Sequence, residues 1–351
     1  MRAQCIYRLV GKSMQRVTAV KRVFSWLSCN QYQYLTSPGH LPTINNCSSQ
    51  RSFSFASRVM SYQAVERGRL NTTDYRVFIT DGEGKPVSPF HDIPLYSNPE
   101  TKECNMVVEI PRWTNHKMEI CKEEPLNPIK QDVKKGKIRF VKNCFPHHGY
   151  IWNYGALPQT WEDVEHEEPS TGTKGDNDPL DVCEIGQKVH KRGSIIQVKI
   201  LGIMCLVDEG ETDWKVICID VTDPLAPQLN DIDDVEKHMP GFIKATREWF
   251  TIYKIPDGKP SNKFAFNGEA KNRDFALRVL DETHGQWQKL VGDGVSNRGD
   301  LCCKNVNVVG SPYKIEPSET KTIIEQAAAV GPAESLPDDV DLWHYIPPSA
   351  L

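Results

Sequence analysis

The apolar pattern of this chain changes once along its length, and that change limits the fold classes open to it. Up to Val221 the apolar residues occur in short runs separated by turn residues, and after Pro224 and Pro227 they recur at helical spacing. The runs predict strands over residues 74–80, 105–113, 137–141, 182–185, 195–206 and 214–221. The second part predicts a short helix capped by Asp231 and longer helices over residues 240–253 and 270–291. Short strands followed by helices are typical of an α+β fold with an antiparallel sheet or a small barrel.

The composition is that of a globular protein. Of 351 residues, 39% are hydrophobic and 25% are charged, which suits one large or two ordinary domains. The longest apolar segment, residues 194–207, carries Lys199 in its middle and is too short to cross a bilayer as a helix. We therefore expect no membrane span and no membrane partner.

Charge is distributed unevenly along the chain. The first 65 residues contain eight basic residues and no acid, so the rest holds all 46 acidic residues against 34 of the 42 basic ones. An acidic body lacks the basic face that direct nucleic-acid binding needs, but it is compatible with binding divalent cations.

The cysteines indicate a reducing compartment. There are eleven, they include no Cys-x-x-Cys pair, and the only close pair is Cys302 beside Cys303. This spacing fits neither a disulfide framework nor a zinc site, so we expect most of these thiols to be small core residues.

Residues 1–60 have the pattern of an organelle transit peptide. They contain no acid, and apolar residues between positions 6 and 17 recur at helical spacing against arginines and lysines. The sequence Arg-Ser-Phe-Ser at residues 51–54 is similar to a mitochondrial processing site, so we expect cleavage near it and a mitochondrial protein. Translation from Met60 would instead give a cytoplasmic form.

Three aspartates, Asp176, Asp178 and Asp181, fall within six residues. Carboxylates this close repel one another unless a cation holds them, and Pro179 prevents an ordinary helix interior. The cluster suits Mg²⁺ or a similar hard cation, which takes oxygen ligands. An EF-hand calcium loop fits poorly, because Asp181 stands where the sharp-turn glycine belongs and no glutamate lies six residues beyond it. A solvated acidic loop remains the alternative.

Five segments carry a combined motif, namely residues 109–115 (EIPRWTN), 145–150 (FPHHGY), 176–182 (DNDPLDV), 208–215 (DEGETDWK) and 253–260 (YKIPDGKP). In this order they resemble the soluble family I inorganic pyrophosphatases of the eukaryotic type, over about residues 65–290. The resemblance implies a small five-stranded OB-like β-barrel with flanking helices, usually assembled as a homodimer. It also implies Mg²⁺-dependent hydrolysis of pyrophosphate to two phosphates, which drives biosynthetic reactions that release pyrophosphate.

The resemblance further implies roles for individual residues. Asp178 orients or deprotonates a water held between two metal ions, and Arg139, Lys117 and Tyr154 act with it in catalysis. The ligands of several Mg²⁺ ions are Asp176, Asp181, Asp213, Asp208 and Glu119. The groups that contact the two phosphoryl units are Lys117, Arg139, Tyr154, Tyr253 and Lys254, and the pocket is completed by Glu109, Tyr150 and Lys215.

Several of these residues also have purely structural explanations. Asp213 and Lys215 could form an exposed hairpin ion pair, which contributes about 0 to 1 kcal/mol. Tyr253 could be the last core residue of its helix, and Glu109 could pair with an arginine.

Composition and the resemblance together divide the chain into three parts. Residues 1–60 are an organelle transit peptide or a disordered leader, residues 61–295 a catalytic domain, and residues 296–351 a C-terminal extension that packs on the surface or is partly disordered. Cys183, beside the acidic motif, departs from the expected pattern. It is either a redox-sensitive thiol or, as we favour, a small buried residue.

Two other functions remain open at this point. The chain could be an interaction or scaffold subunit, for example of a chromatin assembly, with an incidental hydrolase pocket. It could also hydrolyse phosphate esters or nucleotides, although it contains neither a Walker loop nor a Gly-x-Gly-x-x-Gly motif.

Overall fold

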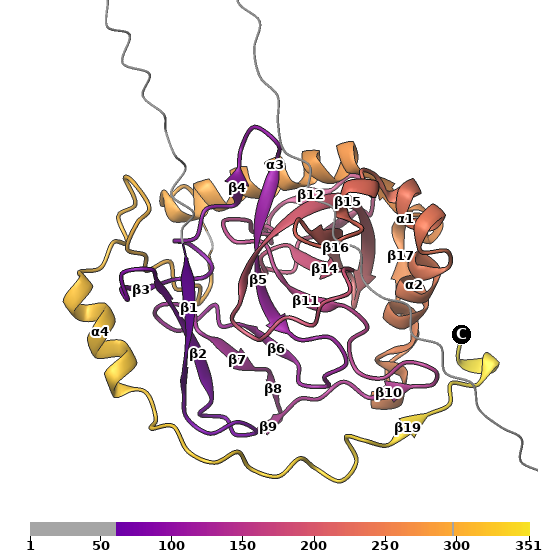
Figure 1. Cartoon of the computed structure of the whole chain (residues 1–351), viewed down its shortest axis with the longest axis horizontal. Helices are drawn as coiled ribbons and strands as arrows, with labels where there is room; N and C mark the ends of the chain where they lie inside the picture. The colour runs from indigo at the N-terminus through magenta and orange to yellow at the C-terminus, as the bar shows by residue number, and fades with distance from the viewer. Residues whose placement is uncertain (1–60, 297) are drawn as a thin grey trace, which may run out of the picture. The chain divides into compact units, whose positions relative to one another are not determined.

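Five strands close into a barrel at the centre of the described part of the chain (Figure 1). The computed structural model describes residues 61–296 and 298–351, so the predicted transit peptide and its processing site lie outside the described residues. The barrel strands are β5 (Glu103–Ile110), β11 (Asn153–Ala156), β14 (Asp181–Glu184), β15 (Ile195–Asp208) and β16 (Glu211–Asp220).

The order of these strands around the ring defines the barrel type. It is β5-β11-β14-β16-β15, and the first residues of β15 return to pair with β5. The β14–β16 pairing is parallel and the other four are antiparallel. A closed five-stranded barrel with this Greek-key order is of the OB type, which confirms the predicted α+β fold.

A second sheet lies beside the barrel, with the order β1-β2-β7-β6 and with β3 paired to β2 (Figure 1). Its strands are β1 (Tyr62–Arg67), β2 (Arg76–Asp81), β3 (Pro86–Val87), β6 (Met118–Ile120) and β7 (Ile129–Gln131). Short strands extend the barrel, namely β4 (Tyr96–Asn98) on β5, and β17 (Lys263–Phe264) and β18 (Lys271–Asn272) on β15. The remaining hairpins are β8 (Val133–Lys134) with β9 (Lys137–Ile138), and β12 (Glu167–Glu168) with β13 (Thr173–Lys174).

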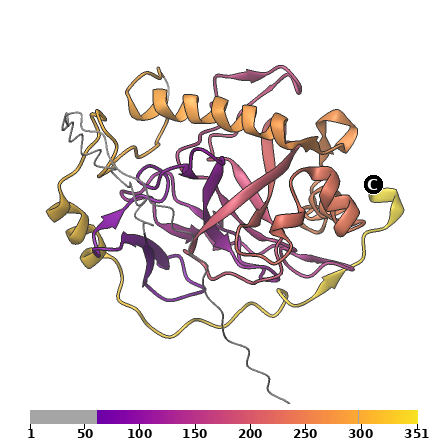
Figure 2. The ribbon, with the colours of Figure 1, turned by 45° about the horizontal axis from the view of Figure 1, so that its top comes forward.

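Helices follow the barrel strands in sequence, as predicted. They are α1 (Ile232–His238), α2 (Phe242–Ile252), α3 (Arg273–Val291) and α4 (Pro317–Gln326), with short 3₁₀ turns at Ala226–Gln228, Ile255–Asp257, Ala265–Gly268 and Pro348–Ala350. Asp231 caps α1 with a full capping box, and Asn272 caps α3 through the N–H of Phe275. Figure 2 shows α3 crossing one side of the barrel. Among the described residues, no helix combines the length and apolar composition that a membrane span requires.

The close approach of β11 to β5 depends on Gly155. A Cβ atom at this position would lie 1.9 Å from the carbonyl oxygen of Val107 on β5. Glycine therefore permits a pairing that any side chain would prevent. The sequence analysis did not predict β11, because its residues, Asn-Tyr-Gly-Ala, lack the β-branched pattern of a strand.

The strand predicted over residues 137–141 is shorter than expected. Only Lys137–Ile138 pairs as β9. The following backbone turns to other partners, since the N–H of Arg139 donates to the carbonyl of Asp132 and that of Val141 to the carbonyl of Asn115. This departure from the strand places Arg139 beside the cavity described below.

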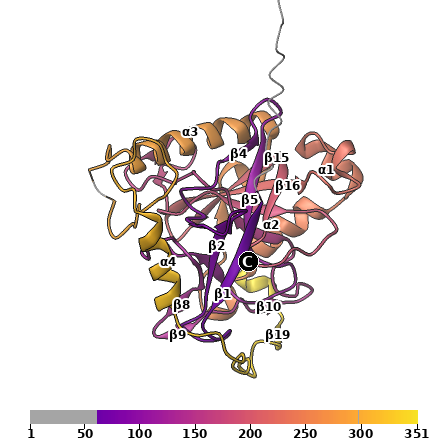
Figure 3. The same ribbon diagram turned by 60° about the vertical axis from the view of Figure 1, so that its left-hand side comes forward.

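Residues 298–351 begin inside the described fold and then follow one edge of it (Figures 1 and 3). Leu301 and Cys303 are buried in the main hydrophobic core. The N–H of Gly68 donates to the carbonyl of Ala328 at 2.8 Å. Further on, β19 (Trp343–His344) pairs in parallel with β10 (Asn143–Cys144). The assignment of this region as an extension separate from the catalytic domain stays a prediction.

Candidate active site

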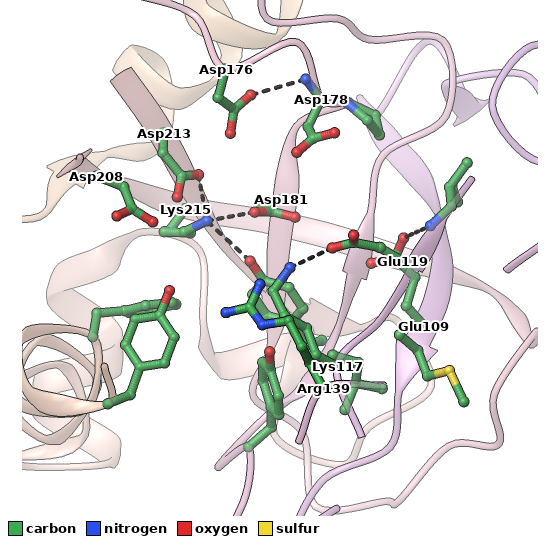
Figure 4. Close-up of a pocket in the computed structure, with 18 of the residues that line it drawn as sticks. Glu109, Lys117, Glu119, Arg139, Asp176, Asp178, Asp181, Asp208, Asp213 and Lys215 are labelled. Carbon is green, nitrogen blue, oxygen red and sulfur yellow. Dashed lines mark hydrogen bonds and ion pairs between the residues drawn. The ribbon is translucent and has the colours of Figure 1, made fainter. Parts of the chain in front are cut away.

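The acidic segment at residues 176–181 forms a fixed loop that leads into β14. Oδ1 of Asp176 accepts a hydrogen bond from the backbone N–H of Asp178 at 2.9 Å. Asn177 has a left-handed φ of 73°, which asparagine tolerates, and its side chain accepts a hydrogen bond from the indole of Trp161. These contacts hold the loop so that its carboxylates lie together on one side of the site (Figure 4).

A second group of acids comes from the hairpin of β15 and β16. Asp213 and Lys215 occupy alternate positions of β16, so their side chains lie on the same face. The parallel pairing of β14 with β16 sets Asp181 opposite Lys215. Nζ of Lys215 contacts Oδ2 of Asp181 at 2.5 Å and also binds Asp213. The two acidic groups therefore meet around one buried lysine (Figure 4).

The remaining walls carry cations and phenols. Lys117 precedes β6 and binds Glu119, and Arg139 lies beside it (Figure 4). Lys254 follows α2 and donates to Oδ1 of Asp208 at 2.6 Å. The phenols belong to Tyr150, Tyr154 and Tyr253, all of which line the cavity.

All of the predicted site residues line one cavity of about 140 Å³. They are Glu109, Lys117, Glu119, Arg139, Tyr150, Tyr154, Asp176, Asp178, Asp181, Asp208, Asp213, Lys215, Tyr253 and Lys254. The structure therefore brings together side chains that the sequence spreads over almost 150 positions. A solvated acidic loop does not account for this convergence.

The structure confirms some of the purely structural explanations given above for single residues and contradicts others. Asp213 and Lys215 do form an ion pair, but both are buried, so the exposed hairpin pair is wrong. Glu109 pairs with no arginine among the described residues, and its Oε1 accepts a hydrogen bond from the N–H of Ile120 at 2.6 Å. Tyr253 does end its helix and stacks on Trp249 at 4.6 Å between ring centroids, yet it also lines the cavity. Cys183 is fully buried, as we favoured.

The cavity raises the pKa of several of its acids. Burial, followed by the charges of Asp178 and Asp213, raises the pKa of Asp176 well above its usual value. Burial and Asp181 raise the pKa of Asp213 to about 7, although Lys215 opposes the shift. Burial is also the main cause of the raised pKa of Glu109. The positive charges of the protein itself are therefore too few to balance these carboxylates.

The cations of the cavity remain charged. Burial by itself would lower the pKa of Lys215, but Asp181 and Asp213 raise it well above the usual range. Burial likewise opposes Lys117, whose pKa the nearby Glu119 raises. The site thus contains charged lysines, but its carboxylates outnumber the cationic side chains beside them.

Three charged residues next to the cavity were missed by the sequence analysis. Asp132 pairs with Arg139 and lies 3.2 Å from Nζ of Lys117. Lys122 pairs with Asp178, and buried Glu162 accepts a hydrogen bond from the N–H of Trp214. No regular spacing marks them, because each belongs to the site through contacts that form only in the folded chain.

The donor set fits a hard divalent cation. The acids offer carboxylate oxygens from two facing groups, and no histidine or cysteine lines the cavity among the described residues. Oxygen-only sites suit Mg²⁺, Ca²⁺ or Mn²⁺ rather than softer ions. The raised pKa values of Asp176 and Asp213 indicate the same need, since a bound cation supplies the missing positive charge.

An OB-type barrel whose cavity joins facing carboxylates to lysine, arginine and tyrosine defines a class of enzyme. The acids suit divalent cations and the basic groups suit a small polyanion, so the class is that of metal-dependent hydrolases acting on phosphoryl groups.

Comparison with known proteins narrows this class. The family model described as inorganic pyrophosphatase matches residues 106–288. The inorganic pyrophosphatase of Drosophila melanogaster is 54% identical over 314 residues, covering 89% of this chain and 92% of that protein. The inorganic pyrophosphatase of Schizosaccharomyces pombe is 58% identical over 290 residues, covering 83% of this chain and 99% of that protein. The solved inorganic pyrophosphatase of Schistosoma japonicum has a TM-score of 0.76 at 51% identity and covers 81% of this chain and 100% of that one.

The chain belongs to the inorganic pyrophosphatase family, and it is an enzyme of that family. Members of the family hydrolyse pyrophosphate and generally depend on Mg²⁺. Nothing in these comparisons supports the alternative of a scaffold subunit.

Proposed function

We propose that the cavity hydrolyses inorganic pyrophosphate to two phosphates with several Mg²⁺ ions bound by its acids. The observation that carries this proposal is the meeting of two clusters of carboxylates with four cationic side chains at one cavity. The truncated pyrophosphatase of Trypanosoma cruzi, solved in complex with PPi, is 44% identical, has a TM-score of 0.63 and covers 71% of this chain and 99% of that one. That complex supports pyrophosphate as the ligand.

The proposed metal ligands are Asp176 and Asp181 of the loop, Asp208 and Asp213 of the hairpin, and Glu119 of β6. When bound, the ions neutralise phosphoryl oxygens and lower the pKa of a coordinated water. Lys215 and Lys254 now occupy positions beside Asp213 and Asp208. Both lysines keep the acid groups together before ions and substrate arrive.

Asp178 is the proposed acceptor of the proton from the attacking water. Its side chain is 43% exposed, against 20% for Asp181 of the same loop, and its ion-pair partner is Lys122. A carboxylate at the open side of the site can receive a proton and pass it to solvent. The ion pair with Lys122 orients the carboxylate.

The basic groups and phenols are the proposed substrate ligands. Arg139 can bind two phosphoryl oxygens at once, while Lys117 and Lys254 act as point charges. Tyr154 and Tyr253 donate neutral hydrogen bonds. Glu109, Tyr150 and Lys215 complete the pocket behind them. These donors stabilise the charge that develops on the leaving phosphate.

The first experiment measures phosphate release from pyrophosphate with Mg²⁺ and again with excess EDTA. We expect release only with Mg²⁺. The Asp178→Asn variant keeps the shape of the side chain but removes its charge, so turnover should fall by about 10² or more. Asp233→Asn, at an exposed position of α1, serves as the control. Normal turnover by Asp178→Asn would contradict the proton-acceptor role.

The same assay separates the alternative substrates. Phosphate esters and nucleotides should neither be hydrolysed at comparable rates nor compete strongly with pyrophosphate. Efficient hydrolysis of a nucleotide would overturn the choice of pyrophosphate as substrate.

A homodimer is also proposed, and an exposed aromatic surface supports it. Phe145 and Trp343 are exposed and lie 5.5 Å apart between ring centroids, at the β10–β19 pair. Trp113 and Tyr345 are exposed as well. Large exposed aromatic groups are typical of protein interfaces. Light scattering should give twice the chain mass, and Trp343→Glu should shift it toward one chain.

We propose mitochondrial targeting for the form that keeps residues 1–60, and a cytoplasmic form for translation from Met60. The acid-free, arginine-rich sequence supports this proposal. Residues 1–58 fused to a fluorescent protein should direct it to mitochondria. A diffuse cytosolic signal would count against targeting.

A further inference from the structure

A second group of metal-binding side chains lies outside the catalytic cavity. His166, Glu168 and Glu282 each offer one ligand atom, and these atoms all lie within 4.8 Å of one another. His166 and Glu168 lie at the start of the β12–β13 hairpin, and Glu282 lies on α3. Figure 2 shows this hairpin beside the helix. Two elements more than 100 residues apart in sequence thus present a nitrogen and two carboxylates to one point.

The contact between His166 and Glu282 is close to the spacing of two ligands of one ion. Nε2 of His166 lies 2.9 Å from Oε1 of Glu282. This nitrogen is buried, yet it has no partner with hydrogen-bond geometry among the described residues. Two ligands about 2.1 Å from one tetrahedral ion lie about 3.4 Å apart, so a side-chain shift of about 0.5 Å admits the ion. The orientation of the two groups, in contrast, does not suit a direct hydrogen bond.

The surroundings of the cluster favour a cation. All three residues line a cavity of about 20 Å³, which is lined by Asp163 as well. A space of this size holds one water molecule or one ion. Among the residues that the structure describes, neither Glu168 nor Glu282 pairs with a lysine or an arginine. The two glutamates therefore have no lysine or arginine to balance their negative charge.

We propose that His166, Glu168 and Glu282 form a peripheral site for a divalent transition-metal ion of the Zn²⁺ class. An imidazole with two carboxylates suits Zn²⁺, with water completing the coordination, and the imidazole selects Zn²⁺ over Mg²⁺. The catalytic cavity offers oxygen donors without imidazole among its described lining. The two sites therefore differ in the ions that they prefer.

An ion at this site would join the β12–β13 hairpin to α3 just ahead of the catalytic loop. The chain from Glu162 to Asp178 already closes on itself, because the N–H of Glu162 donates to the carbonyl of Asp178 at 2.8 Å. The N–H of Asp163 donates to Oε1 of Gln286 on α3 at 3.1 Å. The ion adds a third attachment of the same segment. It thereby stabilises the support of the catalytic loop without contacting substrate.

Equilibrium dialysis with Zn²⁺ in a large excess of Mg²⁺ tests the site on the whole protein. We expect wild type to bind one more Zn²⁺ per chain than His166→Gln, and the variant to bind Zn²⁺ at least tenfold more weakly, about the smallest loss seen when a metal site is disturbed. Glu282→Gln, on the exposed face of α3, should give the same loss and covers the case in which the first variant fails to fold. His147→Gln is the matched control, because Nε2 of His147 lies 3.6 Å from Glu248 and belongs to no group of three possible ligands in the part of the chain that the structure describes.

Nitrogen NMR of the histidine rings supplies a readout that does not depend on Zn²⁺ bound in the catalytic cavity. Zn²⁺ should shift one Nε2 resonance, and that resonance should be missing from the spectrum of His166→Gln. Zn²⁺ should also raise the melting temperature of wild type and of His147→Gln by more than that of the two site variants, which keep only the catalytic cavity as a metal site. Equal Zn²⁺ binding by wild type and His166→Gln, or an unshifted His166 resonance, would overturn the proposal.

Discussion

Asp132 holds Arg139 by two contacts, one to its side chain and one to its backbone. Nη1 of Arg139 donates to Oδ2 of Asp132, and the N–H of Arg139 donates to the carbonyl of Asp132 at 2.8 Å. The same carboxylate lies 3.2 Å from Nζ of Lys117. Although burial opposes it, these two cations lower the pKa of Asp132, so the carboxylate stays ionised. One anion thus positions both cations on this wall of the cavity.

Asp132→Asn should therefore impair catalysis without removing any group that lines the cavity. Both cations would keep their charge but lose their common anchor, and misplacement of about 1 Å can cost about 10²-fold in rate. Steady-state kinetics should show kcat/KM lowered by between about 10-fold and about 10²-fold. Asp339→Asn, which removes the partner of Lys142 on the surface, should leave kcat/KM unchanged. Equal kinetics for the two variants would argue against a positioning role for Asp132.

Arg139→Ala removes the cation itself and should have the larger effect. Loss of one preorganised donor typically lowers kcat by about 10² to 10³. Since the side chain is partly exposed, the circular dichroism spectrum should remain that of the folded protein. Arg139→Lys should recover only part of the rate, because an ammonium group cannot bind two phosphoryl oxygens in a planar fork. Full recovery would indicate that charge alone matters at this position.

Metal binding should release protons near neutral pH. In the metal-free cavity, burial and neighbouring carboxylates hold the pKa of Asp213 at about 7 and that of Asp176 well above its usual value. Both groups must be ionised to bind a cation. Mg²⁺ affinity should therefore fall as the pH drops below about 7, by up to tenfold per pH unit for each proton released. Calorimetry in buffers of different ionisation enthalpy counts these protons, and identical heats in all buffers would contradict the expectation.

The sequence predicted which residues belong to the site better than it predicted the strands and turns that position them. Asp176, Asp178 and Asp181 are visible as a cluster because they share one loop. The apolar runs at 195–206 and 214–221 predicted the two strands of a hairpin, and Asp208 and Asp213 lie just beyond the predicted ends of these strands. The resemblance to a family supplied the distant members, such as Arg139. Local pattern alone would have placed that arginine inside a strand.

Residues that act through long-range contacts were not predictable in this way. Asp132 and Glu162 sit in segments without regular periodicity. The partner of Asp132 is Arg139, which follows β9, and the partner of Glu162 is Trp214 on β16. Strand β11 was missed because Gly155 weakens its propensity, although the close approach of two backbones requires a glycine there. Tertiary contact overrides local propensity at both kinds of position.

Two glycine substitutions should change stability in opposite directions. Gly155→Ala would place a Cβ 1.9 Å from the carbonyl oxygen of Val107, so it should destabilise the fold by about 3 kcal/mol or more. Gly285 lies within α3, and a Cβ there meets nothing within 4 Å. Gly285→Ala should stabilise the fold by about 1 kcal/mol, the helix propensity difference between the two residues. Urea unfolding of both variants measures the difference in sign.

The buried ring of His91 should make folding weaker in acid. Its Nδ1 accepts a hydrogen bond from the indole N–H of Trp287 at 3.0 Å, and its Nε2 lies 3.1 Å from the carbonyl oxygen of Cys302. This arrangement suits the neutral ring protonated on Nε2, because a proton on Nδ1 would break the contact to Trp287. Burial lowers the pKa of His91 to about 4.

The sign of the effect follows from proton binding in the two states. Between about pH 6.5 and about pH 4 the unfolded chain binds a proton at His91 and the folded chain does not, so stability contributed by the neutral ring is lost as the pH falls. The slope attributable to His91 approaches about 1.4 kcal/mol per pH unit within this window. Urea unfolding at several pH values should show this slope in wild type and in His148→Gln, whose histidine is exposed, but not in His91→Gln. The carboxylates of the cavity also titrate, but all three proteins share them, so they cancel in the difference. Parallel pH profiles for wild type and His91→Gln would show that the buried ring contributes nothing to the acid sensitivity of the fold.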